Sequence, residues 1–230
     1  VKGGQDSLQF RAVPDRTRPS RKMLGPVLVT YSRLCRRRPY FDGTDFHQPY
    51  HSHCAGEAIM GRSGVITFKG NPMTLEGDDL AVGSPAPGFT LHYADGGLQE
   101  LTREHLIGKP TIISIVPSLD TPTCAVQTKR FNQELGALGD QINAVTVSRD
   151  LPFAQARFCG AEAVEMRTAS DYQTHQFGRD YGVTIDEIKL LTRAVIILDS
   201  EGNVAYKEIV PEVTEEPDYD AAMAALRMLI

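Results

Sequence analysis

The most informative stretch of the sequence is Thr111-Ile-Ile-Ser-Ile-Val116, a largely β-branched run that ends at Pro117. It lacks the alternation of a half-exposed strand, so it predicts a central strand buried on both faces. A loop over 118–123 follows, and apolar residues then recur at three- and four-residue spacing to about position 138, which predicts a helix. A buried strand that leads through a short loop into a helix is typical of an α/β sheet.

The chain on both sides of this unit alternates between strand and helix patterns. We expect a β-hairpin over 65–75 with its turn at Gly70-Asn71-Pro72, a strand over 89–93 and a short helix over 100–106. Further strands are expected over 142–147, 167–169, 194–198 and 204–210, and helices over 153–158, 173–181 and 218–229. This order predicts a three-layer α/β/α domain, and within that class it suits a thioredoxin-like fold with an N-terminal β-hairpin.

The composition of the chain changes near Met60. Residues 1–59 are rich in Arg, Pro and His and have no helix or strand period, so we expect a disordered or extraneous extension. The folded domain is then expected over 60–230. The formal net charge of −5 includes ten Lys/Arg and five acidic residues within 1–59, so the remainder carries −10. Such an acidic body disfavours nucleic acid as a partner.

Several other protein classes lack support in the sequence. No apolar run is long enough to span a bilayer, and the stretch 24–31 resembles a signal peptide only faintly, which favours a cytoplasmic location. Four cysteines are too few for a disulfide-stapled secreted scaffold, so each thiol is considered individually. The chain contains no C-x-x-C, P-loop, G-x-G-x-x-G or G-x-S-x-G motif, which argues against dithiol oxidoreductases, nucleotide-driven enzymes and serine hydrolases.

Cys124 has the richest chemical context in the chain. It follows the buried strand by one loop and lies in the first turn of the next predicted helix. There the free backbone N–H groups and the helix dipole favour a thiolate over a thiol. Pro122 and Thr121 supply a fixed turn and a hydroxyl just before it. This context favours a reactive thiol over the alternative, a buried structural cysteine.

Two more residues become candidates in combination with Cys124. Cys159 lies on a predicted short helix, where it would ordinarily be a core residue; near a reactive thiol it could instead capture a sulfenic acid. Arg193 immediately precedes the strand over 194–198. Its guanidinium could stabilise a thiolate and hold a peroxide oxygen, or it could be a surface residue at a strand start. Spacing alone does not separate these alternatives.

Potential zinc ligands gather in the N-terminal extension, but they do not predict a metal site. Their spacing matches no familiar zinc site, and the segment has no predicted scaffold to hold a tetrahedral geometry. The residues are Cys35, His47, His51, His53 and Cys54.

The segment Pro117-Ser-Leu-Asp-Thr121-Pro-Thr-Cys124 fits the P-x-x-x-T-x-x-C active-site pattern of the peroxiredoxins. Four further stretches resemble the bacterial thiol peroxidase (Tpx) subfamily, the atypical two-cysteine peroxiredoxins. They are Thr67-Phe-Lys-Gly-Asn-Pro-Met-Thr74, the block 150–160, Leu191-Thr-Arg-Ala-Val195 and Thr214-Glu-Glu-Pro-Asp-Tyr219. The resemblance runs from about Val65 to the C-terminus and does not include residues 1–59.

This resemblance implies roles for the matching residues. Cys124 would be the peroxidatic cysteine and Cys159 the resolving cysteine of an intramolecular disulfide. Thr121 and Arg193 would orient and stabilise the thiolate and the peroxide, and Pro117 would shield the site from water. Because such thiols lie on separate helices and a disulfide needs Cα atoms within about 7 Å, we expect both segments to unwind locally between half-reactions.

The resemblance also implies the wider function. Members of the subfamily are homodimers that need no metal or organic cofactor and reduce hydrogen peroxide and alkyl hydroperoxides with electrons from thioredoxin. We therefore expect a thioredoxin-dependent peroxidase with a role in antioxidant defence. Two alternatives stay open at this point: a non-enzymatic peroxide sensor that passes its disulfide to a partner protein, and a thioredoxin-fold binding module with inert cysteines.

Overall fold

The computed structural model describes residues 61–230, so the expectations for residues 1–59, including the five candidate zinc ligands, lie outside the described part. The strands are β1 Arg62–Phe68, β2 Asn71–Glu76, β3 Thr90–Ala94, β4 Leu98–Thr102, β5 Thr111–Ile115, β6 Asn143–Ser148, β7 Arg167–Ser170, β8 Thr184–Ile185, β9 Ala194–Leu198 and β10 Val204–Ile209. The α-helices are α1 Pro122–Gly136, α2 Pro152–Glu162, α3 Gln176–Asp180 and α4 Tyr219–Arg227, with 3₁₀ turns at Arg103–Leu106 and Gly139–Gln141.

The main sheet is mixed and has the strand order β10-β9-β5-β6-β7-β3-β4. Strands β5, β6 and β7 are parallel, whereas β9, β10, β3 and β4 join through antiparallel pairs. β5 pairs with β6 on one side and β9 on the other, and all five of its residues are buried. The predicted central strand is therefore confirmed.

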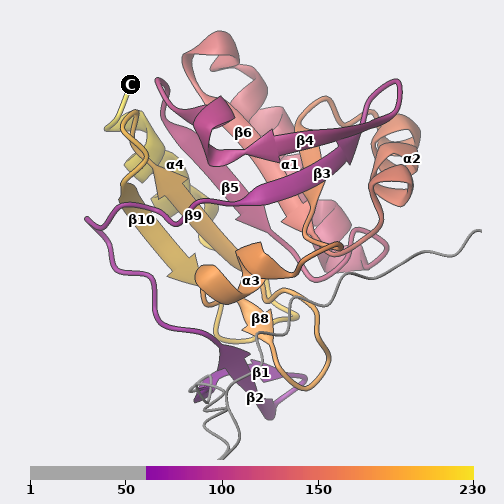
Figure 1. Ribbon diagram of the computed structural model, residues 1–230, viewed down its shortest axis with the longest axis vertical. Coiled ribbons are helices and arrows are strands. Elements are labelled where there is room, and N and C mark those ends of the chain that lie inside the picture. The colour runs from indigo at the N-terminus through magenta and orange to yellow at the C-terminus, as the bar shows by residue number, and fades with distance from the viewer. Residues whose placement is uncertain (1–60) are drawn as a thin grey trace, which may run out of the picture. The chain divides into compact units, whose positions relative to one another are not determined.

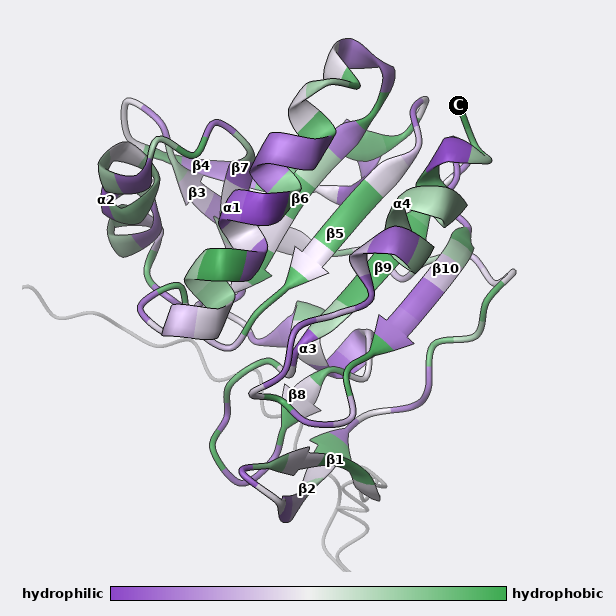
Figure 2. Cartoon of the chain, turned by 180° about the vertical axis from the view of Figure 1, so that it is seen from behind, coloured by the Kyte–Doolittle hydropathy of each residue, from purple (hydrophilic) through white to green (hydrophobic). Residues whose placement is uncertain are grey.

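Helices and an extended segment cover the two faces of this sheet (Figure 1). One apolar cluster joins Phe131 of α1 and Met223 of α4 to the sheet, and α2 packs at its edge. The cluster on the opposite face contains Phe89 and Phe177, whose rings meet edge to face with centroids 5.5 Å apart. Figure 2 shows β5 and β9 as mostly hydrophobic under α1 and α4, whereas the edge strand β10 is largely hydrophilic. The sheet and the segments that cover its two faces form the predicted three-layer arrangement.

A second, small sheet has the order β1-β2-β8. The predicted hairpin is confirmed, but its turn lies at Lys69-Gly70, both with positive φ, rather than at Gly70-Asn71-Pro72. Two residues with φ above zero are what a tight two-residue hairpin turn requires. Pro72 belongs to β2 and faces Thr67, whose backbone N–H and C=O bond instead to the 211–213 segment. Pro72 therefore removes no hydrogen bond from the hairpin ladder.

The helix expected over 100–106 is the main error of the sequence-based assignment. Residues Leu98–Thr102 form β4, and only Arg103–Leu106 turn as a 3₁₀ helix. Leu101 is buried opposite Leu91 of β3, so cross-strand packing outweighs the helix-forming residues of this segment. The short strand β8, which pairs with the end of β2, was not predicted.

Candidate active site

Cys124 lies at the start of α1, directly after the central strand. Thr121 is the N-cap residue and Pro122 the first helical residue, so Cys124 is in the first turn, as the sequence predicts. Its side chain is 1% exposed and packs with Val116 and Leu119 of the preceding loop. The sulfur is thus enclosed by apolar side chains at the positive end of a helix dipole.

Arg193 lies beside this sulfur. The guanidinium Nη2 donates to Cys124 Sγ at 3.3 Å, Nη1 donates to Gln127 Oε1 at 2.5 Å, and Nε donates to the Val213 carbonyl oxygen at 3.0 Å. The side chain is buried, with 2% exposed, so Arg193 is not a surface residue at a strand start. A positive group this close stabilises negative charge on the sulfur.

Gln127 and Ser114 complete the arrangement around Arg193, and sequence reasoning missed both. Gln127 Nε2 donates to Ser114 Oγ at 2.9 Å, which fixes its amide so that Oε1 faces the guanidinium. Gln127 lies three residues after Cys124, so helical spacing alone places it on the same face and could have marked it. The Val213 carbonyl belongs to the backbone of a remote segment, so no pattern in the sequence could mark it as a partner of Arg193.

Thr121 and Pro117 lie in the loop that leads to Cys124. The Thr121 hydroxyl donates to the Ser118 carbonyl oxygen at 3.0 Å, and within 61–230 no hydrogen bond joins it to the Cys124 sulfur. Thr121 is exposed and Pro117 is buried. Thr121 closes the turn before α1, and Pro117 is enclosed two residues after the end of β5.

Cys159 lies in the last turn of α2 and is half-buried. Its Sγ is 3.5 Å from Thr168 Oγ1. Burial raises the pKa of the Cys159 thiol, and the Thr168 contact lowers it less. Cys124 and Cys159 are both free thiols. Phe158 packs against the apolar cluster around Cys124, so α2 and the start of α1 are neighbours.

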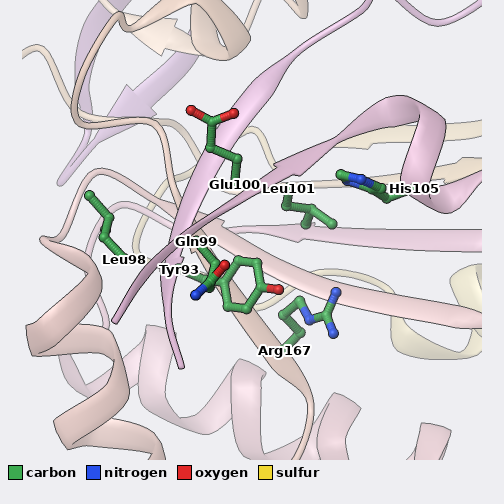
Figure 3. A pocket seen from close by; sticks show the side chains of 7 residues that line it. All are labelled: Tyr93, Leu98, Gln99, Glu100, Leu101, His105 and Arg167. Carbon is green, nitrogen blue, oxygen red and sulfur yellow. The ribbon is translucent and has the colours of Figure 1, made fainter. Parts of the chain in front are cut away.

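A pocket on the β3–β4 hairpin, shown in Figure 3, contains neither thiol. It is lined by residues of both hairpin strands with His105 and Arg167, and the Arg167 guanidinium lies 4.8 Å from the centroid of the Tyr93 ring. An adjoining pocket shares Tyr93 and Arg167 and reaches Cys159. The half-buried thiol therefore borders this open side of α2, whereas Cys124 is enclosed.

The described part of the chain contains neither a metal-binding cluster nor a helix that could span a membrane. Among residues 61–230, no three His, Cys, Asp or Glu side chains gather in the way a metal ion requires. The helices of the same region are all too short or too polar to cross a membrane.

A sequence model of the family described as Redoxin matches residues 81–223. The thiol peroxidase of Bacillus subtilis is 46% identical over 166 residues, which cover 72% of this chain and 98% of that protein. The thiol peroxidase of Streptococcus sanguinis is 49% identical over 166 residues, with 72% and 100% covered. The thiol peroxidase of Mycobacterium tuberculosis is 45% identical over 164 residues, with 70% and 97% covered.

Solved structures agree with the predicted fold. A peroxiredoxin-like protein from Aquifex aeolicus superposes with a TM-score of 0.68 at 41% identity, covering 74% of this chain and 98% of that one. A thiol peroxidase from Chromobacterium violaceum, at 21% identity, superposes with a TM-score of 0.63 over 71% and 95%, and supports the fold alone. The predicted thioredoxin-like fold with an N-terminal hairpin is confirmed.

Proposed function

Because the chain belongs to the thiol peroxidase family of the peroxiredoxins, we propose that Cys124 carries its chemistry and that Cys159 is the resolving thiol. The protein is a thiol peroxidase, an enzyme that acts on a hydroperoxide, so a binding module with inert cysteines and a non-enzymatic sensor are both set aside. One observation supports Cys124 above all: its buried sulfur accepts a hydrogen bond from Arg193 at 3.3 Å.

In the first step, the Cys124 thiolate attacks one oxygen of the hydroperoxide. An S–O bond forms as the O–O bond breaks, and the leaving alkoxide or hydroxide takes a proton to become alcohol or water. The sulfur is oxidised to a sulfenic acid by two electrons, and the peroxide is reduced by the same two. Charge spreads over the sulfur and both oxygens in the transition state, where the Arg193 guanidinium stabilises it most. Thr121 orients the peroxide, and Pro117 shields it from water.

In the second step, the Cys159 thiol condenses with the sulfenic acid. An S–S bond forms, the S–O bond breaks, and the oxygen leaves as water. Cys124 lies in the first turn of α1 and Cys159 in the last turn of α2, and both are free. Cys124 is enclosed beside Arg193, whereas Cys159 borders the open side of α2. We infer that the start of α1 and the end of α2 unwind for this step, to bring the Cα atoms within the about 7 Å that a disulfide needs.

The remaining parts of the proposal rest on family membership. Thioredoxin reduces the disulfide by thiol–disulfide exchange, and the chain works as a homodimer. The substrates are hydrogen peroxide and alkyl hydroperoxides. A cycle that starts from a free thiol fits a reducing compartment such as the cytoplasm.

The direct test is a coupled turnover assay. NADPH consumption is followed with thioredoxin, thioredoxin reductase and cumene hydroperoxide for the wild type, Cys124→Ser and Cys159→Ser. We expect the wild type to turn over, Cys124→Ser to be inactive, and Cys159→Ser to lose cycling through thioredoxin. Full activity of Cys124→Ser would show that the thiol chemistry lies elsewhere.

A further inference from the structure

The carboxylate of Asp150 joins two segments of the chain. Its Oδ1 accepts a hydrogen bond from Ser118 Oγ at 2.7 Å. Its Oδ2 accepts from the Leu119 backbone N–H at 2.8 Å and from Ser148 Oγ at 2.8 Å. Both oxygens are engaged, and two of the three donors belong to the loop that leads into α1.

This loop forms part of the apolar surface around the peroxidatic sulfur. Leu119 is 3% exposed and packs with Val116 and Cys124. Phe158, which immediately precedes the resolving cysteine in α2, packs against the same cluster. The bond between Asp150 and the Leu119 backbone therefore helps to fix the surroundings of the Cys124 sulfur.

Asp150 also holds the beginning of α2, which starts two residues later at Pro152. Its carbonyl oxygen accepts from Ser170 Oγ at 2.5 Å, and its backbone N–H donates to Ser148 Oγ at 3.2 Å. The same Ser148 hydroxyl accepts from Gln155 Nε2 at 2.9 Å. These bonds tie the first turn of α2 to β6 and β7, so one residue connects the segments that carry both thiols.

We propose that Asp150 is a positioning residue that sets the balance between the form that reduces peroxide and the form that closes the disulfide. This inference rests on the proposed roles of Cys124 and Cys159. With the carboxylate engaged, the loop holds Cys124 beside Arg193. The loop leaves this arrangement before the sulfur reaches Cys159, and the hydrogen bonds to Asp150 break as it leaves. Weaker hydrogen bonds to Asp150 therefore slow the oxidation of Cys124 by peroxide and speed the formation of the disulfide.

The fate of the sulfenic acid reports this balance. It either condenses with the Cys159 thiol to give a disulfide and water, or it reacts with a second hydroperoxide. In the second case another S–O bond forms, the O–O bond breaks, and the products are a sulfinic acid and an alcohol or water. The ratio of sulfinic acid to disulfide at a given peroxide concentration measures how long the loop stays in place.

The test uses Asp150→Asn in the full chain, since the amide keeps the shape but loses one acceptor oxygen. Reduced protein is mixed with increasing cumene hydroperoxide, quenched with N-ethylmaleimide, and the cysteine products are measured by mass spectrometry. We expect the rate constant of Cys124 oxidation to fall about tenfold, as for one lost hydrogen bond to a charged group. The ratio of sulfinic acid to disulfide should fall by a similar factor. A purely structural defect would instead slow both steps.

Two variants make the result decisive. Asp120→Asn is the matched control, because Asp120 lies on the same loop and its carboxylate, within residues 61–230, makes only an exposed ion pair with Arg157 at 3.9 Å. Its backbone N–H, which donates to Ser118 Oγ, is kept in the variant, so both quantities should match the wild type. Ser118→Ala removes one hydrogen-bond donor to Asp150. It should lower the rate constant of Cys124 oxidation and the ratio of sulfinic acid to disulfide, each by less than Asp150→Asn does. This variant replaces Asp150→Asn in the test if that protein does not fold.

An unchanged ratio in Asp150→Asn, or a slower disulfide step, would overturn the inference while leaving the proposed function intact. Absence of a Cys124–Cys159 disulfide in the wild type would overturn both.

Discussion

At Arg193 the chain buries a guanidinium, which costs free energy unless its donors are satisfied. Within residues 61–230 its hydrogen-bond partners are the Val213 carbonyl, the Gln127 amide and the Cys124 sulfur. Only the sulfur can take a negative charge among these partners. When Cys124 ionises, its thiolate forms an ion pair with the buried Arg193 guanidinium, whose other acceptors are neutral. The reactive form of the thiol is therefore also the form that best stabilises the buried arginine.

Gln127 is expected to matter for activity although it does not contact the sulfur. Gln127→Leu removes the acceptor for Arg193 Nη1, so the guanidinium is free to turn away from Cys124. A lost hydrogen bond to a charged group corresponds to about 1.5–3 kcal/mol, so kcat/KM for peroxide should fall about tenfold to a hundredfold. Steady-state turnover with thioredoxin measures this effect.

The matched control for this prediction is Thr128→Val. Thr128 is the next residue in α1 and is equally buried, but its hydroxyl has no hydrogen-bond partner in the part of the chain that the structure describes. The variant should retain wild-type kcat/KM. Equal activity of both variants would contradict the role given to Gln127.

At the scale of elements, the residues that cap α2 hold the backbone of Cys159 through its carbonyl oxygen. The C-cap residue after Glu162 is Ala163, which has a left-handed conformation with φ 53° and donates its backbone N–H to the Cys159 carbonyl oxygen. This left-handed conformation costs free energy for an L-residue with a side chain, but not for glycine. α2 therefore ends in a strained cap, and in the proposed mechanism this cap opens when Cys159 reacts.

Replacing this cap residue should change the rate of disulfide formation in both directions. Ala163→Gly should stabilise the folded cap by about 1 kcal/mol, after allowing for the greater freedom of glycine in the unwound segment. Disulfide formation should then slow about fivefold. Ala163→Val should have the opposite effect. Quenched-flow mass spectrometry checks both, and a shift of the same sign in the two variants would contradict the role of the cap.

Glu212 connects the N-terminal hairpin to the backbone next to the site. Its carboxylate accepts hydrogen bonds from the backbone of Lys69 and Gly70 and from the hydroxyls of Thr67 and Thr214. The Thr214 hydroxyl and the other donors hold the pKa of Glu212 far below its ordinary value of 4.5. The neighbouring Val213 is the residue whose carbonyl receives Arg193 Nε.

A lowered pKa in the folded chain means that the Glu212 carboxylate stabilises folding above about pH 4.5, and that this contribution is lost as the pH falls further. Glu212→Gln should therefore lose less stability than the wild type between about pH 7 and pH 3.5, in urea unfolding. Glu215→Gln is the control, since Glu215 is exposed and its carboxylate accepts no hydrogen bond within residues 61–230. Identical losses in all three proteins would contradict the role of Glu212.

Elements with a strong local pattern were predictable, and those that depend on partners were not. The run 111–116 and the spacing of Phe131 and Leu135 identified β5 and α1. The segment 98–106 has helix-forming residues but becomes a strand because Leu101 packs against Leu91. β8 is two residues long and exists through its pairing with β2, so no local pattern marks it.

At the scale of the whole molecule, the site is assembled from four distant parts of the chain. Ser114, Gln127, Arg193 and Val213 belong to β5, α1, the residue before β9 and the segment after β10. The sequence could nominate Cys124, Thr121 and Arg193, because each lies next to a recognisable element. Of the residues that hold Arg193, Gln127 shares a helix face with Cys124 and could be marked by spacing. The Val213 carbonyl reaches Arg193 only through the order of strands in the sheet, which a single sequence does not contain.

The core on the α3 side should make the fold sensitive to alkaline pH. Tyr181 is fully buried, donates its hydroxyl to the Pro87 carbonyl oxygen at 2.9 Å, and stacks on Phe177. Burial raises the pKa of Tyr181 well above its ordinary value of 10.0. The neutral phenol therefore stabilises the folded chain below that value, and the contribution is lost as the pH rises above it.

Tyr181→Phe should lower the free energy of unfolding by about 1 kcal/mol at neutral pH, through the lost hydrogen bond. It should also reduce the decline in stability between about pH 9 and pH 11, measured by urea unfolding under reducing conditions. A decline as steep as that of the wild type would contradict the account of this core.

Mapping the first oxidation product onto the sequence shows which thiol peroxide oxidises. Reduced Cys159→Ser protein receives one equivalent of hydrogen peroxide with a 1,3-dione probe that labels sulfenic acids, and the labelled peptides are identified by mass spectrometry. We expect the label on Cys124, and we expect it to be strongly reduced in the further variant Arg193→Met. A label on Cys35 or Cys54 with Cys124 unmodified would contradict this expectation.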